Sequence, residues 1–295
     1  MPEMIASRSF GVFTHALRSE ESAHESAIRQ AAEQLEELGY SCVWLGGSSS
    51  VRHAAPIVDS TSRITVATGI TNIWFDAPED VARDRAALEA AHPGRFLLGL
   101  GASHGALARD YQRPYSAMVA YLDRLDTAEA PVPAGGRVLA ALGPKMLALS
   151  RERAAGAHPY LVDPEFVRQA RGRLGPDALL APEVTVVMEK DPVQARARAR
   201  EWIAYYLTLP NYLANLRRLG FSDQDFANGG SDRLIDGLVV WGDDETLVRG
   251  IRAYHDAGAD HLALQVLSTR EEEFAPLAEW RALAGLLGLT ATTGT

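Results

Sequence analysis

Residues 63–74 read RITVATGITNIW, a stretch that begins as a strand and then loses the strand pattern. Its first half carries β-branched residues at every second position, Ile64, Val66 and Thr68, which is typical of a buried strand. Gly69 then lacks a Cβ, and Thr71 and Asn72 have side chains that bond to nearby backbone. The pattern predicts a strand ending in a bulge or tight bend that another molecule can approach. A plain strand ending in a glycine turn is the alternative.

Seven more apolar runs along the chain are predicted as strands, over residues 10–14, 42–45, 95–100, 138–142, 157–162, 183–188 and 261–266. Helices are predicted between them: after a capping box at Ser22–Glu25, from Pro78, Pro114, Pro144 and Pro164, over 193–219 with a break at Pro210, from Asp243, and around Leu277. Eight strands, most followed by a helix, indicate a parallel sheet and a (β/α)8 TIM barrel formed as one domain by residues 1–295. A doubly wound open sheet is the alternative.

Composition excludes several classes of protein. Hydrophobic residues make up 47% and charged residues 23% of the chain, and no apolar run approaches the roughly 20 residues that span a membrane. Residues 1–10 lack the apolar core of a signal peptide, so we expect a cytoplasmic protein. The net charge of -9 argues against nucleic-acid binding. Cys42 is the single cysteine and the histidines are scattered, so neither a disulfide nor a metal site is predicted.

Unusual residues follow three of the predicted strands. Gly69 to Asn72 end the strand of 63–74, Gly101 to His104 follow the strand RFLLGL at 95–100, and Leu142 to Lys145 stand at the end of the strand over 138–142. In a barrel these positions share the C-terminal face, where active sites lie. His104 can titrate near neutral pH, and the helix starting at Pro144 offers free N–H groups and a lysine to an anion. The run GGSSS at 46–50 lacks the spacing of a phosphate-binding motif and is predicted as a plain loop.

The motifs TGITN, GRFLLGLGASH, AALGP and AHPYLV, in this order and spacing, resemble the luciferase-like monooxygenase superfamily. Within it, the chain is most similar to the branch of coenzyme F420-dependent oxidoreductases, over nearly its whole length from Phe10 to Leu287. This resemblance implies a luciferase-like TIM barrel that moves hydride between a deazaflavin and a small organic substrate. It also implies a homodimer, since members of the superfamily are often dimers.

The same resemblance assigns roles to the three clusters. It implies a non-prolyl cis peptide bond at Gly69–Ile70 that backs the deazaflavin ring, beside Thr71 and Asn72. The remaining cofactor contacts that it implies are Gly101, Ala102 and Ser103 along the ring and Leu142, Gly143, Pro144 and Lys145 at the phosphate-bearing tail. His104 matches the position of an acidic proton donor in a sugar-phosphate dehydrogenase of the superfamily, so it is the candidate catalytic residue. A structural histidine at the barrel rim is the alternative.

One position departs from the resemblance. F420-dependent dehydrogenases of this type often have an Asp-His pair shortly after a tryptophan at strand two, whereas Gly47 and Ser48 follow Trp44 here. Three alternatives therefore stay open: an FMN-dependent monooxygenase with a reductase partner, a catalytically silent paralogue that binds a flavin, and an unrelated barrel acting on phosphorylated metabolites. His15 and His158 are further polar groups near strand ends.

Overall fold

The computed structural model describes residue 5 and residues 7–104, 112–268 and 274–290. Its strands are β1 (Ser9–Thr14), β2 (Cys42–Gly46), β3 (Thr65–Gly69), β4 (Thr71–Asn72), β5 (Phe96–Gly101), β6 (Arg137–Leu139), β7 (Gly156–Ala157), β8 (Leu179–Leu180), β9 (Glu183–Val187), β10 (Val239–Trp241) and β11 (His261–Val266). The α-helices are α1 (Glu25–Glu37), α2 (Ala55–Ser60), α3 (Pro78–Ala91), α4 (Pro114–Thr127), α5 (Pro144–Arg153), α6 (Pro164–Leu174), α7 (Pro192–Tyr206), α8 (Pro210–Arg218), α9 (Asp223–Phe226), α10 (Asp232–Leu238), α11 (Asp244–Asp256) and α12 (Leu277–Leu287).

The strands form a ring. All pairings are parallel, and the sheet runs β11-β1-β2-β3-β5-β6-β7-β8. The ring closes because β8 and β9 belong to one stretch separated by two residues: β8 pairs with β7, and β9 pairs with β11. β10 adds an outer strand to β9. The TIM-barrel prediction is confirmed, and the doubly wound sheet is excluded.

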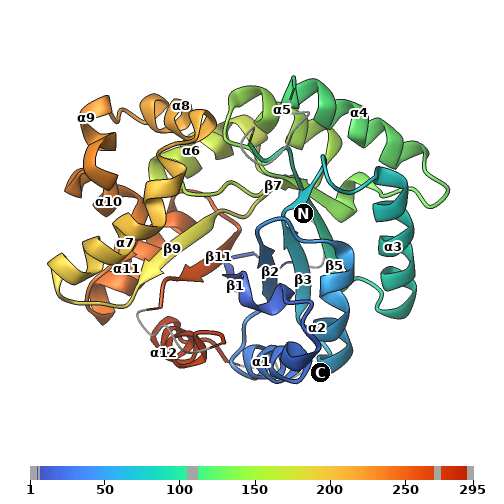
Figure 1. The fold of residues 1–295 in the computed structure, drawn as a ribbon, viewed down its shortest axis with the longest axis horizontal. Coiled ribbons are helices and arrows are strands. Elements are labelled where there is room, and N and C mark those ends of the chain that lie inside the picture. The colour runs from blue at the N-terminus through green and yellow to red at the C-terminus, as the bar shows by residue number, and fades with distance from the viewer. Residues whose placement is uncertain (1–4, 6, 105–111, 269–273, 291–295) are drawn as a thin grey trace.

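Helices surround the strands, with α3 and α4 on one side and α7 to α11 on the opposite side (Figure 1). Two cores result. Alternate side chains of the central strands point outward to the helices, as Val43 and Val66 do, or into the barrel, as Trp44 and Ala67 do. Among the described residues, no helix has the length and apolar composition to cross a lipid bilayer.

The bulge predicted at the end of the third strand is present. Ala67 pairs with Leu97 and Thr71 with Leu100, so four steps along one strand face three along the other. Thr68 Oγ1 fills the gap: it donates to the Gly99 carbonyl at 2.9 Å and accepts from the Gly99 N–H at 2.9 Å. A Cβ on Gly99 would lie 1.9 Å from the Thr68 carbonyl oxygen, so this bulge requires glycine on the neighbouring strand.

Two local predictions are wrong. The capping box at Ser22–Glu25 does not form, because Ser22–His24 is a 3-10 turn whose Ser22 carbonyl accepts the Glu25 N–H directly. The strand predicted over 157–162 ends at Ala157, since Pro159 lacks an N–H and Leu161 has a φ of 54°. After α8, the polar segment 221–238 contains α9 and α10, which begin directly after the capping residues Ser222 and Ser231.

Candidate active site

A cavity of about 480 Å³ opens at the C-terminal ends of the strands. It brings together residues from all three predicted clusters: Gly69 and Ile70, Ala102 to His104, and Leu142 and Gly143. Its other walls come from β1, β7, α7 and α8, through residues that include Phe13, His158, Tyr206 and Arg218. A second hollow, of about 620 Å³, lies among α10, β10 and α11, and a third, of about 520 Å³, lies beside His15 and Arg18. Neither contains residues of the three clusters.

The other predicted cofactor residues lie behind or beside this wall. Thr71 and Asn72 are fully buried. Gly101 lies against Ile70, since a Cβ there would come within 2.7 Å of the Ile70 side chain. Pro144 and Lys145 form the first turn of α5 and are exposed to solvent. The structure therefore places these five as supports or rim residues of the cavity.

The bulge backbone is fixed by the loop that follows β2. The Ile70 N–H donates to the Gly47 carbonyl at 2.8 Å, and the Ser49 N–H donates to the Ile70 carbonyl at 2.9 Å. Thr71 Oγ1 adds a bond to the Ser49 carbonyl at 3.0 Å. The peptide bond between Gly69 and Ile70 is cis, as the resemblance implies. The GGSSS run, predicted as a plain loop, thus supports the bulge through bonds from Gly47 and Ser49. These bonds join the ends of two strands, so the sequence of the loop alone does not indicate them.

Gly47 and Ser48, which replace the expected Asp-His pair, both line the cavity. The space beside Gly47 is already taken: a Cβ there would lie 3.2 Å from Arg18 Nη2 and 3.3 Å from His15 Cδ2, and the φ of Gly47 is 77°. Burial, with a smaller contribution from Arg18, lowers the pKa of His15 to about 4. His15 is therefore neutral at pH 7. Its ring lines the cavity beside Gly47 and Ser48, where the Asp-His pair of the related dehydrogenases is missing.

His104 lies at the rim of the cavity. Its Nδ1 is 3.3 Å from Ser103 Oγ, and its Nε2 is 3.3 Å from the Tyr205 hydroxyl of α7. Burial lowers the pKa of the half-buried ring below the usual value of a histidine. A neutral imidazole with two hydroxyl neighbours can hold or pass a proton, so its placement fits the proton relay expected from the sequence.

His158 lines the cavity floor and packs on further rings inside the barrel. The rings of His158 and Trp44 stack at a centroid distance of 4.1 Å. Trp44 Nε1 donates to His261 Nε2 at 3.0 Å, so His261 Nδ1 carries the hydrogen that points to Ser9 Oγ at 2.8 Å. Burial lowers the pKa of His158 to about 4 and that of His261 to about 3. These rings are uncharged at pH 7.

The outer end of the cavity is suited to an anion. A Cβ on Gly143, the N-cap of α5, would meet no atom within 4 Å, so there is open space above this backbone. Arg218 lines the same end and donates to the Leu142 carbonyl and to Asn215 Oδ1. Within the described part of the chain no carboxylate pairs with Arg218, and nearby Arg173 contributes further positive charge. A helix N-terminus and an available guanidinium together favour a phosphate.

Tyrosines from two helices form the side wall. The Tyr206 hydroxyl and the Trp202 Nε1–H both donate to the Tyr160 hydroxyl, which in turn donates to Gln265 Oε1 at 2.9 Å. Tyr160, Tyr206 and Tyr212 line the cavity, and the last two belong to α7 and α8.

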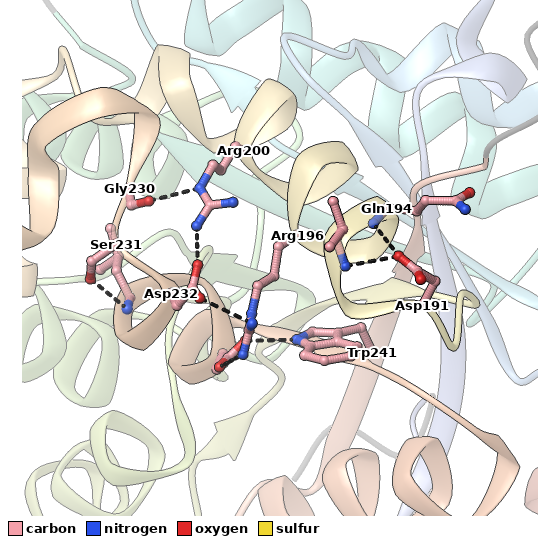
Figure 2. A network of polar contacts seen from close by, with 11 residues as sticks. Asp191, Gln194, Arg196, Arg200, Gly230, Ser231, Asp232 and Trp241 are labelled. Carbon is pink, nitrogen blue, oxygen red and sulfur yellow. Dashed lines mark hydrogen bonds and ion pairs between the residues drawn. The ribbon is translucent and has the colours of Figure 1, made fainter.

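Ion pairs hold α7, and with it this wall, against α10 (Figure 2). Arg196 binds Asp236 through two bonds of 2.9 and 2.6 Å, and its guanidinium lies 5.1 Å from the Trp241 ring. Arg200 bonds to Asp232 and to the Gly230 carbonyl. These contacts fix α7, which carries Tyr206 as its last residue.

The sequence matches the luciferase-like monooxygenase family over residues 8–125 and 119–261. A comparison with curated proteins finds no match. Similar solved structures include an F420-dependent secondary alcohol dehydrogenase in complex with an F420-acetone adduct, at 15% identity and a TM-score of 0.72, covering 96% of this chain and 99% of the other.

Two further similar structures represent both types of cofactor. One is the coenzyme F420-dependent tetrahydromethanopterin reductase from Methanopyrus kandleri, with 18% identity, a TM-score of 0.70 and coverage of 96% and 98%. The other is the oxygenating constituent of 3,6-diketocamphane monooxygenase from Pseudomonas putida in complex with FMN, with 15% identity, a TM-score of 0.61 and coverage of 96% and 97%. At these identities the three likenesses show a common fold.

Proposed function

The chain belongs to the luciferase-like monooxygenase family, and from this premise we propose that it is an F420-dependent oxidoreductase. It moves hydride between the deazaflavin and a small organic substrate. Structures similar to this chain include both F420-dependent and FMN-binding enzymes, so family membership supports an oxidoreductase or monooxygenase without choosing the cofactor. The homodimer expected from the sequence remains a prediction that light scattering can test.

The observation that supports the proposal is a single cavity that combines a backing for a flat ring with a site for a phosphate. Gly69 and Ile70 form the backing, and Ala102 and Ser103 border it. The open space above Gly143 and the guanidinium of Arg218 form the phosphate end. A flavin or deazaflavin with a phosphorylated side chain has these two parts, so the residues present fit such a group.

The charge at the mouth favours F420 over FMN. Arg218, Arg173 and the exposed Lys145 place positive charge around the phosphate end, on a chain whose net charge is -9. F420 continues beyond its phosphate into an acidic oligoglutamate tail, which these cations would attract, whereas FMN ends at the phosphate. The preference for F420 rests on this difference.

The cofactor, when bound, supplies the hydride chemistry, and the protein positions the reactants and handles the proton. We assign the proton to His104, because its ring is neutral, lies at the cavity edge and contacts the hydroxyls of Ser103 and Tyr205. Phe13 and the tyrosines of the side wall exclude water and offer an apolar surface to the substrate.

The activity test uses protein loaded with F420 and a panel of small alcohols, aldehydes and ketones, with F420 absorbance as the readout. We expect a substrate-dependent change that His104→Ala slows about 100-fold or more while the dissociation constant for F420 stays the same. His92→Ala, a surface histidine paired with Asp59, is the matched control. Oxygen consumption with reduced FMN alone would favour the monooxygenase. Cofactor binding without turnover would favour a silent paralogue.

A further inference from the structure

His158 has one ring nitrogen whose bonding is complete and one whose bonding is not. The ring is 2% exposed and follows β7. Trp44 stacks on it at 4.1 Å and Phe13 at 5.9 Å, with interplanar angles of 14° and 25°. Because these rings occupy its faces, His158 can form new contacts only through its edge.

The hydrogen on the ring can be placed from its partner. Nδ1 lies 2.7 Å from the Ala181 carbonyl oxygen, which can only accept a hydrogen bond, so Nδ1 carries the hydrogen. Burial lowers the pKa of this imidazole to about 4, and the ring is neutral at pH 7. Nε2 therefore presents a lone pair.

Among the described residues, no group donates to His158 Nε2, although the atom is buried. Leaving a buried acceptor unpaired is unfavourable, and such groups usually have a partner. His261, in the same barrel interior, uses both ring nitrogens, through Trp44 and Ser9. The difference between the two is location, since His158 lines the cavity together with Phe13 and Tyr160.

We propose that His158 Nε2 accepts a hydrogen bond from the ligand held in this cavity, so that the ligand must present an N–H or O–H group at the cavity floor. This inference rests on the proposed function in placing a flavin-type cofactor and its substrate there. Two sources of the donor share this chemistry: the imide N–H of the cofactor ring and a hydroxyl of the substrate. A ligand with only an acceptor at this position would face the His158 lone pair and bind less well.

One substitution removes only the acceptor side of the His158 ring, and a second, at His255, is its control. His158→Asn keeps a side-chain N–H for the Ala181 carbonyl and removes the acceptor at Nε2. His255→Asn is the matched control, because His255 also donates from Nδ1 to a carbonyl, at 3.0 Å, and has an unpartnered buried Nε2, yet packs against Phe10 away from the cavity lining. If an unpartnered nitrogen is only a tolerated defect, both variants behave alike.

Two pairs of probes differ in the donor alone. FMN and 3-methyl-FMN differ in the imide hydrogen, and cyclohexanol and cyclohexanone differ in the hydroxyl. Dissociation constants come from fluorescence quenching for the first pair and from melting-temperature shifts for the second, measured with and without F420. We expect wild type and His255→Asn to prefer the donor-bearing member of one pair about tenfold, and His158→Asn to bind both members within twofold. The pair that responds identifies the donor.

Imidazole 15N spectra provide a direct readout, with the His158 signals assigned from their loss in His158→Asn. We expect hydrogen on Nδ1 in the free protein and a shift of the Nε2 resonance when the donor-bearing probe binds. Equal binding within both pairs in wild type, unchanged discrimination in His158→Asn, binding of no probe, or hydrogen on Nε2 in the free protein would each overturn the inference. Loss of FMN and F420 binding with intact alcohol discrimination would instead refute the proposed cofactor and keep the role of His158.

Discussion

The floor and the side wall of the cavity are built by different means. The floor is formed by His158 together with Trp44 and His261 in the barrel interior beneath it, and these three residues are fully or almost fully buried and bond inside the barrel. The wall consists of tyrosines on α7 and α8, and Figure 2 shows that α7 is joined to α10 by ion pairs such as Arg200 with Asp232. Removing floor residues should affect folding and binding together, whereas wall residues can change with less effect on the fold.

The largest difference between the two regions should appear in stability. Trp44→Ala removes a fully buried ring and leaves His261 Nε2 without a donor, so the free energy of unfolding should fall by about 3–5 kcal/mol. Trp202→Ala removes a partly exposed ring of the wall and should cost less than half as much. Urea unfolding measures both. Equal losses would show that floor and wall are one packing unit.

Acid should destabilise the protein through the buried histidines. Burial lowers the pKa of His158 to about 4 and that of His261 to about 3, whereas in the unfolded chain both titrate near 6.5. Between these values the unfolded chain binds more protons, so stability falls as pH drops. Glu183 opposes this trend, because burial raises its pKa to about 7. Below that pH the folded protein binds a proton at Glu183 more readily than the unfolded chain does, and this proton stabilises the fold.

The two buried histidines outweigh the one carboxyl, so we expect a net loss on the order of 1.5 kcal/mol in the free energy of unfolding between pH 6.5 and 5. Urea titrations at several pH values measure it. His158→Asn removes one of the titrating groups and should flatten the dependence. A variant as sensitive to acid as wild type would show that His158 does not titrate as its burial indicates.

The smallest of these effects concerns the phosphate end. Arg218→Gln should weaken binding of both F420 and FMN about tenfold, or about 1.4 kcal/mol, and reduce its sensitivity to salt, because a charge-assisted bond to the phosphate is lost. Arg217→Gln is the control, since Arg217 pairs with Asp223 on the outer surface. Loss of affinity in both variants would indicate general electrostatic attraction without a specific phosphate contact.

Strands were predictable where a buried apolar run is long. RFLLGL and the first half of 63–74 lie within one or two residues of β5 and β3, because both faces of these strands are buried. The two-residue β8 and the three-residue β10 were missed, because strands this short are too short to show an alternating hydrophobic pattern. The capping pattern at Ser22 failed because the 3-10 turn Ser22–His24 satisfies the Glu25 N–H through the Ser22 carbonyl.

The candidate site was predictable only in part. Parallel strands end on one face, so the clusters at Gly69, Ala102 and Leu142 could be expected to meet, and they do. The assignment of Arg218 to the phosphate end and the lone pair of His158 depend on contacts between residues distant in sequence. Neither has a local pattern from which it could be recognised.

The central claim is that the three strand-end clusters form one site for a phosphorylated deazaflavin. A parallel titration of the purified protein with F420 and FMN, oxidised and reduced, tests it most directly, with fluorescence quenching and melting temperature as readouts. We predict saturable binding with F420 at least about tenfold tighter than FMN, and a stability gain of about 2.7 kcal/mol at a hundred times the dissociation constant. Binding of neither cofactor would contradict the claim.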